Sequence, residues 1–269
     1  MRKAGFAGLV TLLIGLGLAC ATSPTGRRQI MLVSDAQMEQ MGAEAFAQLK
    51  SEQKVSTDAA TNRYVGCVAR SITGVLSAEE TQGGWEVVVF EDDAANAFAL
   101  PGGKIGVHAG LLKVATNQDQ LATVIGHEVA HVIANHSAER VSDQMAVQLG
   151  AQGAGALLGA AGDPTSPLHG LALGALGIGA QGVVLKFSRT HESEADEIGL
   201  EYMARAGFDP RQSVSLWQNM AASGGARAPE FLSTHPSPET RIRDLQARIP
   251  QVLPLMQQAH ASGRRPSCR

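Results

Sequence analysis

The residues best suited to chemistry are His127, Glu128 and His131, an HExxH pattern inside an apolar run that is typical of a helix. Because the two histidines lie one helical turn apart, their imidazoles project from one face and can bind the same metal ion. Glu128 lies about 100° around the helix from His127, where its carboxylate can act as a general base on water that the metal activates. The pattern favours a zinc-dependent peptidase site. The alternative is a helix whose two histidines have only structural partners.

A carboxylate further along the chain is expected to complete this site, because catalytic zinc usually takes three protein ligands and a water. Glu192 and Asp196 are one helical turn apart in a segment that predicts a second helix. Glu192 can therefore bind the ion while Asp196 accepts a hydrogen bond from a ligand imidazole, whereas Glu194 points to the other side. Without the HExxH pattern, this acidic cluster would be typical of a solvated helix face.

These helices and several shorter motifs resemble the family of integral-membrane and periplasmic zinc metallopeptidases that includes the CAAX prenyl protease, HtpX, BepA and LoiP, in its bacterial periplasmic lipoprotein branch. The resemblance covers most of the chain after its leader and adds Thr25-Gly26-Arg27-Arg28, the run from Asn96 to Gly103, and Thr234-His235-Pro236 followed by Arg241. It implies a gluzincin-like metallopeptidase domain with one zinc ion per chain, held by His127, His131 and Glu192. It also implies that Glu192, and not Glu194, is the third ligand.

Other residues near these motifs have different expected roles. The metzincin pattern requires Gly at position 134 and His at position 137, where this chain has Ala134 and Ser137, so His136 is not expected to bind the metal. A lone histidine before proline in a polar loop is more often structural than catalytic. The resemblance nevertheless implies that His235 lies near the zinc, either stabilising the oxyanion or replacing the water in a latent state. It also implies that Arg241 supports this region of the catalytic site.

Short strands are predicted from Trp85 to Phe90 and on both sides of a Pro-Gly-Gly turn that ends at Gly103. In the resembling enzymes an edge strand here lies beside the active-site cleft, where an extended substrate pairs with its backbone. The matching residues, which we expect to bind substrate, are Asn96, Ala97, Phe98 and Ala99. An ordinary core hairpin is the alternative, and one strand can serve as both.

The composition favours one mainly α-helical domain with few strands. The resemblance implies that the small β-sheet lies beside the active-site helix, which gives an α+β class. The chain has 269 residues, of which 44% are hydrophobic and only 4% aromatic, enough for a core of small side chains. A net charge of −3 gives no basic footprint for nucleic acid. We expect the metallopeptidase domain to span residues 34–260, with a C-terminal tail at 261–269. Helices are predicted at 34–53, 57–76, 117–142, 190–206, 210–222, 238–248 and 250–260.

The N-terminal segment predicts export. Residues 1–19 have the pattern of a signal peptide, with two basic residues followed by an apolar run. The residues around Cys20 resemble a bacterial lipoprotein processing site, which implies a lipid on Cys20 and a lipidated linker over residues 20–33. Because Ala21 follows the cysteine, the outer membrane of a Gram-negative bacterium is favoured. The expected location is therefore the periplasm, lipid-anchored to the membrane. Ordinary secretion and an uncleaved anchor are the alternatives.

The two remaining cysteines, Cys67 and Cys268, form an even pair. In an oxidising periplasm they can form a disulfide that pins the C-terminal tail to the helix predicted at 57–76. Two free thiols are an equally good interpretation. The spacing of these cysteines does not suggest zinc.

The apolar run at residues 168–185 leaves the membrane topology open. It is long enough for a membrane span but contains His169, Gln181 and five glycines, so we favour a helical hairpin packed near the cleft. By resemblance, the expected substrates are misfolded or incompletely assembled envelope proteins. An alternative is a chaperone-like lipoprotein with a latent zinc site, which the presence of Glu128 disfavours because a pure binder needs no base. A third possibility is an integral-membrane protease.

Overall fold

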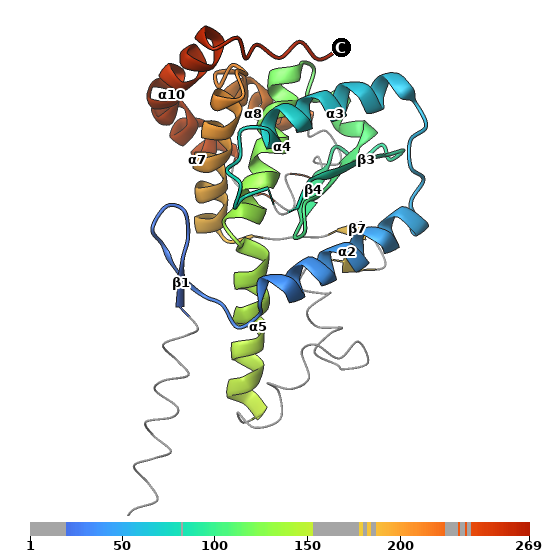
Figure 1. The fold of residues 1–269 in the computed structure, drawn as a ribbon, viewed down its shortest axis with the longest axis vertical. Coiled ribbons are helices and arrows are strands. Elements are labelled where there is room, and N and C mark those ends of the chain that lie inside the picture. Colours follow the sequence, from blue (N-terminus) through green and yellow to red (C-terminus); the bar gives the residue numbers. More distant parts are fainter. Residues whose placement is uncertain are drawn as a thin grey trace, which may run out of the picture.

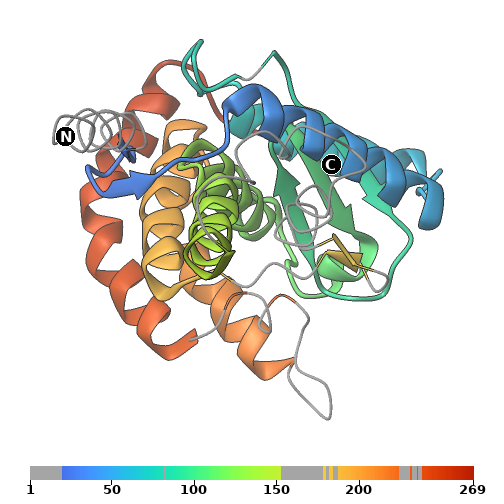
Figure 2. The same cartoon turned by 90° about the horizontal axis from the view of Figure 1, so that it is seen from below.

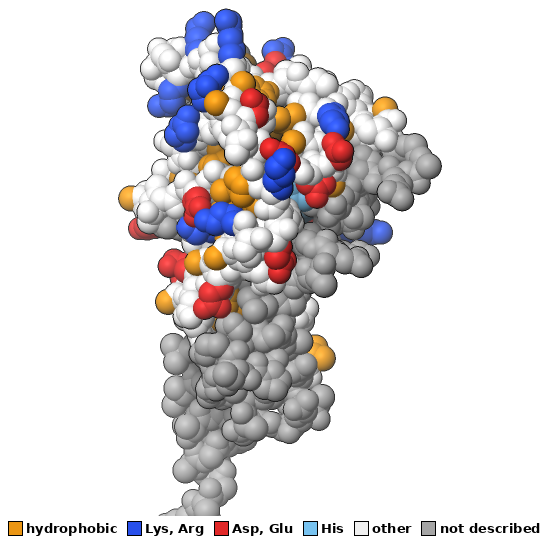
Figure 3. Space-filling view, turned by 90° about the vertical axis from the view of Figure 1, so that its right-hand side faces the viewer, with side chains coloured by type: hydrophobic (Ala, Val, Ile, Leu, Met, Phe, Trp, Pro, Cys, Tyr) orange, Lys and Arg blue, Asp and Glu red, His pale blue; other side chains and the backbone are white. Residues whose placement is uncertain are grey.

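The computed structural model describes residues 20–81, 83–152, 178–179, 182–183, 187–223, 231, 235 and 238–269. Within these residues the fold is mainly helical with small sheets, which confirms the predicted α+β class (Figure 1). Helices α10, α7 and α4 form successive layers, and a three-stranded sheet lies beyond α4 (Figure 2). On the face shown in Figure 3, acidic and basic side chains are interspersed over much of the described surface.

The elements follow one another along the chain as β1 (Cys20–Thr22), β2 (Arg28–Ile30), α2 (Asp35–Glu52), α3 (Ala59–Thr73), β3 (Glu86–Phe90), β4 (Ala97–Leu100), β5 (Lys104–His108), the 3-10 helix η1 (Ala109–Lys113), α4 (Gln118–Ile133), α5 (His136–Gln152), β6 (Ile178–Gly179), β7 (Gly182–Val183), α7 (Arg189–Arg205), α8 (Gln212–Ala222) and α10 (Pro238–Ala261).

The three-stranded sheet has the order β3-β5-β4, with β3 parallel and β4 antiparallel to β5. The turn between β4 and β5 requires positive φ angles of 79° at Gly102 and 69° at Gly103, which glycine adopts without strain. Helix α2 covers one face of the sheet, where Phe46 packs edge-on against Phe90 and Phe98. Helices α3 and α4 pack on the other face. Strand β4, at the edge of this sheet, is therefore buried along its length.

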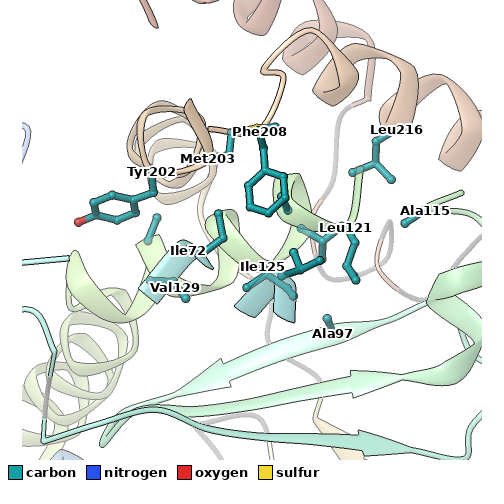
Figure 4. Packing of buried hydrophobic residues seen from close by; sticks show 14 of the residues in the cluster. Ile72, Ala97, Ala115, Leu121, Ile125, Val129, Tyr202, Met203, Phe208 and Leu216 are labelled. Atoms are coloured by element: carbon teal, nitrogen blue, oxygen red, sulfur yellow. The ribbon is translucent and has the colours of Figure 1, made fainter. Parts of the chain in front are cut away.

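Helix α4, which carries His127 and His131, lies at the centre of the main core. It begins at the N-cap Asn117, whose side chain accepts hydrogen bonds from two backbone N–H groups of the first turn. Figure 4 shows Ile125 and Val129 of this helix between the sheet and α7, among the residues that line the core. Because almost every position after the first turn is buried, polar side chains on α4 need specific partners.

Two glycines allow α4 and α7 to touch through their backbones. A Cβ atom added to Gly199 would lie 2.8 Å from the carbonyl carbon of Gly126 and 2.8 Å from the amide nitrogen of His127. A Cβ on Gly126 would lie 2.9 Å from the carbonyl oxygen of Gly199. Neither position leaves room for a side chain, so this contact fixes the spacing of the two helices that carry the predicted ligands.

The predicted single helix at 117–142 is wrong, because the chain breaks it into α4 and α5. Asn135 has a positive φ of 55°, a conformation that asparagine tolerates better than most residues. The carbonyl of Ala134, which the break removes from the helical ladder, accepts a hydrogen bond of 2.7 Å from Gln29 Nε2. The break depends on this distant contact, which the local sequence does not reveal.

Two other helical predictions also need correction. The segments 238–248 and 250–260 form the single helix α10, which continues through Pro250 and Pro254. Buried Ile249 and Val252 pack into the core on both sides of the first proline, which explains why one lost backbone hydrogen bond does not end the helix.

The apolar run at 168–185 lies largely outside the described residues. The parts described, β6 and β7, are short antiparallel strands rather than helix, with Ile178 paired to Val183 and Gly179 to Gly182. Among the helices that the structure describes, none combines enough length and hydrophobicity to cross a lipid bilayer.

The structure joins Cys67 of α3 to Cys268 in a disulfide that spans 201 residues of sequence. The tail also contacts the start of α4, where Gln118 donates to the carbonyl of Pro266 and accepts from the amide of Cys268. The sequence left this pairing open. A disulfide of this kind typically stabilises a fold by about 2–4 kcal/mol, mainly by restricting the unfolded chain.

The contact between α4 and α7 makes a testable prediction. Gly199→Ala should lower the free energy of unfolding by about 1–3 kcal/mol, because the added methyl group meets backbone atoms that cannot move aside. Gly66→Ala is the matched control, since a Cβ there meets only the end of the flexible Arg70 side chain. Urea unfolding monitored by circular dichroism measures both. Equal stability of Gly199→Ala and wild type would contradict the close contact.

Candidate metal centre

Four buried side chains converge between α4, α7 and the segment that contains His235. His127, His131, Glu192 and His235 each offer one possible ligand atom, and these atoms lie within 4.8 Å of one another. His127 Nε2 is 3.0 Å from His131 Nε2 and 3.5 Å from a Glu192 oxygen. His131 Nε2 is 3.6 Å from the other Glu192 oxygen. The structure thus brings the three predicted ligands together.

This donor set fits a divalent metal ion. Four ligands placed about 2.1 Å from a tetrahedral ion lie roughly 3.4 Å from one another, close to the spacings among His127, His131 and Glu192. Burial alone raises the pKa of Glu192, but the charges and hydrogen bonds of His235 and His127 hold that pKa well below its usual range. The carboxylate is therefore ionised, as a metal ligand must be.

Asp196 and Arg241 contact the predicted ligands His127 and Glu192 through ion pairs and hydrogen bonds. Asp196 Oδ1 lies 3.0 Å from His127 Nδ1, so the nitrogen opposite the ligand atom has the carboxylate partner predicted from the sequence. Arg241 donates to both Asp196, at 2.7 Å from Nε, and Glu192, at 2.8 Å from Nη1. Its guanidinium stacks over Trp217, 3.8 Å from the ring centroid. The charge of Arg241 lowers the pKa of Asp196 against the raising effect of burial.

His235 lies inside the group of ligands. Its Nδ1 is 2.8 Å from Glu192 Oε1 and 3.2 Å from His127 Nε2, while its Nε2 is 3.4 Å from Glu128 Oε1. The residue is 2% exposed. Its neighbours Thr234 and Pro236, which belong to the motif, lie outside the described residues.

Phe231 contacts His235 through both its backbone and its ring. The amide of His235 donates to the carbonyl of Phe231, and the two rings stack with centroids 4.3 Å apart. The amide of Phe231 donates in turn to the carbonyl of Ala95, just before β4, at 3.2 Å. Phe231 therefore links His235 to the backbone just before β4.

Glu128 faces the same buried space without joining the ligand group. Burial raises the pKa of Glu128 to about 8, and its carboxylate accepts a hydrogen bond from the backbone N–H of Ala99 in β4. Glu128 Oε1 is buried and has no hydrogen-bond partner among the described residues. One side of the carboxylate is thus held by β4, while Oε1 lies beside the ligand group, 3.4 Å from His235 Nε2.

The hydrogen bonds and packing around β4 show where the predicted substrate residues lie. The amide of His108 donates to the carbonyl of Asn96, so Asn96 belongs to the hydrogen-bonded register between β4 and β5. By the alternation of an antiparallel pair, the backbone groups of Ala97 and Ala99 point away from β5. The hydrogen bond from Ala99 to Glu128 shows that this outer edge faces α4. Phe98 instead belongs to the aromatic cluster under α2.

Comparison with known proteins decides the family. The model of peptidase family M48 matches residues 59–249, well over half of the chain and within the predicted domain at 34–260. The chain belongs to peptidase family M48. The mitochondrial metalloendopeptidase OMA1 of Schizosaccharomyces pombe is 35% identical over 233 residues, which are 85% of this chain and 66% of that protein. The predicted metallopeptidase family is therefore confirmed.

Other M48 relatives are similarly distant. The beta-barrel assembly-enhancing protease of Escherichia coli is 32% identical over 84% of this chain and 47% of its own length. The metalloendopeptidase OMA1 of Danio rerio is 33% identical over 86% of this chain and 50% of its own length. This M48 chain thus spans about half to two thirds of the length of these relatives.

A hydrogen-bonded path behind His131 was not predicted from the M48 sequence. His136 Nδ1 lies 2.8 Å from His131 Nδ1, and His136 Nε2 lies 3.1 Å from a Glu194 oxygen. Burial lowers the pKa of His136 to about 4, so its ring is neutral. Glu194 also bonds Arg27, which lies in the Thr25-Gly26-Arg27-Arg28 motif. That motif was the only signal for this path in the sequence, and the motif did not indicate what Arg27 does.

The ligand assignment predicts unequal effects of two substitutions on α7. Glu192→Ala should weaken zinc binding by more than the roughly 10- to 100-fold typical of losing a partner behind a ligand, because it removes a donor atom. Glu197→Ala, which removes only a carboxylate paired with Arg248, should leave zinc content unchanged. Metal analysis after dialysis against a chelator measures both. Full zinc content in Glu192→Ala would disprove the assignment.

Proposed function

We propose that this chain is a zinc-dependent endopeptidase of the bacterial cell envelope that degrades misfolded or misassembled envelope proteins. The observation that carries the proposal is the convergence of His127, His131 and Glu192 beside a Glu128 carboxylate oxygen that has no hydrogen-bond partner among the described residues. Two imidazoles and a carboxylate are a common ligand set of catalytic zinc, and Glu128 has no role in a site that only binds. Membership of family M48 supports the same reaction class.

The side chains of the site divide the hydrolysis between them. Zinc held by His127, His131 and Glu192 would supply Lewis-acid polarisation of water and of the scissile carbonyl. Glu128 accepts the proton of the attacking water and later delivers it to the leaving amine. The hydrogen bond from Ala99 keeps the Glu128 carboxylate in one orientation during both transfers.

The outer edge of β4 is the proposed substrate-binding strand. The carbonyls of Ala97 and Ala99 that point away from β5 can accept hydrogen bonds from an extended peptide, as in β-strand addition, while the amide of Ala97 donates to Asn96 Oδ1 and that of Ala99 to Glu128. Because Ala99 also contacts Glu128, a peptide paired here would pass directly beside the base. Recognition through the backbone suits a protease of unfolded chains, since it requires no particular side chains.

His235 is proposed as a latch that keeps the enzyme inactive at rest. Its Nδ1 lies within hydrogen-bond distance of both Glu192 and His127, rather than to one side of the ligands. In addition, Phe231, which bonds the amide of His235, donates to the carbonyl of Ala95, just before β4. His235 and Phe231 thus contact the ligands and the beginning of the proposed substrate strand together. An oxyanion partner would require neither contact.

The location and substrates follow from the N-terminus and the relatives. Cys20 is the proposed lipid attachment site, which would anchor the chain to the outer membrane on its periplasmic side. The disulfide between Cys67 and Cys268 suits an oxidising compartment such as the periplasm. The Escherichia coli relative is named a beta-barrel assembly-enhancing protease, which supports envelope proteins as the substrate class. A client-binding chaperone is the second candidate, and an intact base argues against it.

Replacement of the base separates the two candidates. Glu128→Gln should lower the rate of hydrolysis of an unfolded protein at least about 100-fold while zinc content stays at wild-type level, because only the proton acceptor is lost. Glu201→Gln, at a partly exposed carboxylate of α7, is the control. A fluorogenic unfolded substrate and metal analysis provide the two readouts. Undiminished hydrolysis by Glu128→Gln would refute the mechanism, whereas client binding without hydrolysis in wild type would favour the chaperone.

Replacement of the latch tests the resting state. His235→Ala should raise the initial rate of hydrolysis of the same substrate, since it uncovers the ligands without removing any of the three. If His235 is instead an oxyanion partner, the rate should fall roughly 10- to 1000-fold at unchanged zinc content. An unchanged rate would reject both roles and leave His235 a structural residue.

A further inference from the structure

The segment that begins at Cys20 forms a β-hairpin that contacts α5 and α7. Strands β1 and β2 pair in register from Cys20 with Ile30 to Thr22 with Arg28. Their turn is closed by a hydrogen bond from the amide of Ser23 to the carbonyl of Arg27. Figure 1 shows the hairpin beside the junction of α4 and α5. The chain segment that follows the proposed lipid site therefore lies close to the metal ligands.

The turn of this hairpin binds two carboxylates on different helices. Arg27 donates to both oxygens of Glu139 on α5, at 2.5 and 2.7 Å, and to Glu194 on α7, at 2.9 Å. The hydroxyl of Thr25 donates to the other oxygen of Glu194. Gln29 adds a hydrogen bond of 2.8 Å to Glu139. Because both carboxylates are largely buried, the guanidinium supplies charge compensation that solvent cannot.

From Glu194 the hydrogen bonds continue to a metal ligand. His131 presents Nε2 to the other ligands, so its remaining proton is on Nδ1 and is donated to His136 Nδ1 at 2.8 Å. His136 must then carry its own proton on Nε2, which is donated to Glu194 at 3.1 Å. Only one arrangement of these protons satisfies all the bonds. Glu194 thereby selects the ring orientation of both histidines.

The break between α4 and α5 makes this path possible. On a continuous helix, residues five positions apart are separated by about 140° around the axis, so His136 could not face His131. The positive φ of Asn135 turns the chain and brings the two rings to a centroid distance of 4.9 Å. The hairpin also stabilises the break, since Gln29 binds the carbonyl of Ala134.

We propose that the hairpin at residues 20–30 is a positioning element of the metal centre. Arg27 and Thr25 hold Glu194, which fixes His136 and, through it, the ring of His131. The inference rests on the proposed metal site but concerns residues outside it. Because the hairpin begins at Cys20, a pull on the membrane anchor that displaces it would weaken metal binding. Attachment at the membrane and competence of the metal site are thus coupled through one set of hydrogen bonds.

The direct test is zinc affinity, measured by chelator competition on the full chain. Arg27→Ala should weaken zinc binding roughly 10- to 100-fold and change the visible spectrum of the cobalt-substituted protein, because His131 loses its fixed orientation. Arg28→Ala, at the exposed neighbouring residue of the same hairpin, should match wild type in both readouts. Wild-type affinity and spectrum in Arg27→Ala would overturn the proposal. Failure of wild type itself to bind zinc would instead refute the metal site on which the proposal rests.

A milder variant protects the test against misfolding. Thr25→Val keeps every charge and nearly the same shape but removes one hydrogen bond to Glu194. It should weaken zinc binding several-fold with unchanged circular dichroism, in the same direction as Arg27→Ala. Equal zinc affinity of Thr25→Val and wild type, in a protein where Arg27→Ala is unfolded, would count against a positioning role.

A double-mutant cycle separates positioning from general support of the fold. His136→Phe removes the link between Glu194 and His131, so adding Arg27→Ala to it should weaken zinc binding little further. His136→Gln should restore most of the affinity, because its amide offers one acceptor and one donor in the same order as the imidazole. Fully additive losses from Arg27→Ala and His136→Phe would show that Arg27 does not act through His136 and would overturn the proposal.

Discussion

The architecture depends on the backbone contact between α4 and α7 at Gly126 and Gly199. On α7, Glu192 and Asp196 precede Gly199 at the seven- and three-residue spacings of one helix face. On α4, His127 directly follows Gly126. The contact between the two glycines therefore places the predicted ligands of α4 and α7 next to one another. The metal site is a consequence of how closely two helices pack, and it tolerates no side chain at the point of contact.

Two elements from opposite ends of the described chain, helix α10 and the N-terminal hairpin, stabilise this candidate site. From the C-terminal helix α10, Arg241 bonds Asp196 and so fixes His127. From the N-terminal hairpin, Arg27 reaches the path behind His131. His127 is thus held directly, and His131 through His136, by a carboxylate that an arginine neutralises. This arrangement avoids the large penalty of burying unpaired carboxylates beside a metal centre.

The part of the site that the sequence predicts correctly is local. The spacing between His127 and His131, and between Glu192 and Asp196, follows from helical periodicity and needs no knowledge of the fold. The path through His136 could not be predicted, because it requires a helix break that a distant residue, Gln29, helps to stabilise. The disulfide and the continuous helix α10 could not be predicted for the same reason. In both cases, packing between distant parts of the chain selects one of two structures that the local sequence allows equally.

Crystals of the zinc-loaded protein measured at the zinc absorption edge test the central claim most directly. We predict a single anomalous peak within bonding distance of His127 Nε2, His131 Nε2 and the carboxylate of Glu192, about 2.0–2.2 Å from each. The carboxylate of Glu194 should then remain with His136 and Arg27, outside the coordination sphere. No peak at this position, or a peak bound by Glu194 in place of Glu192, would contradict the account.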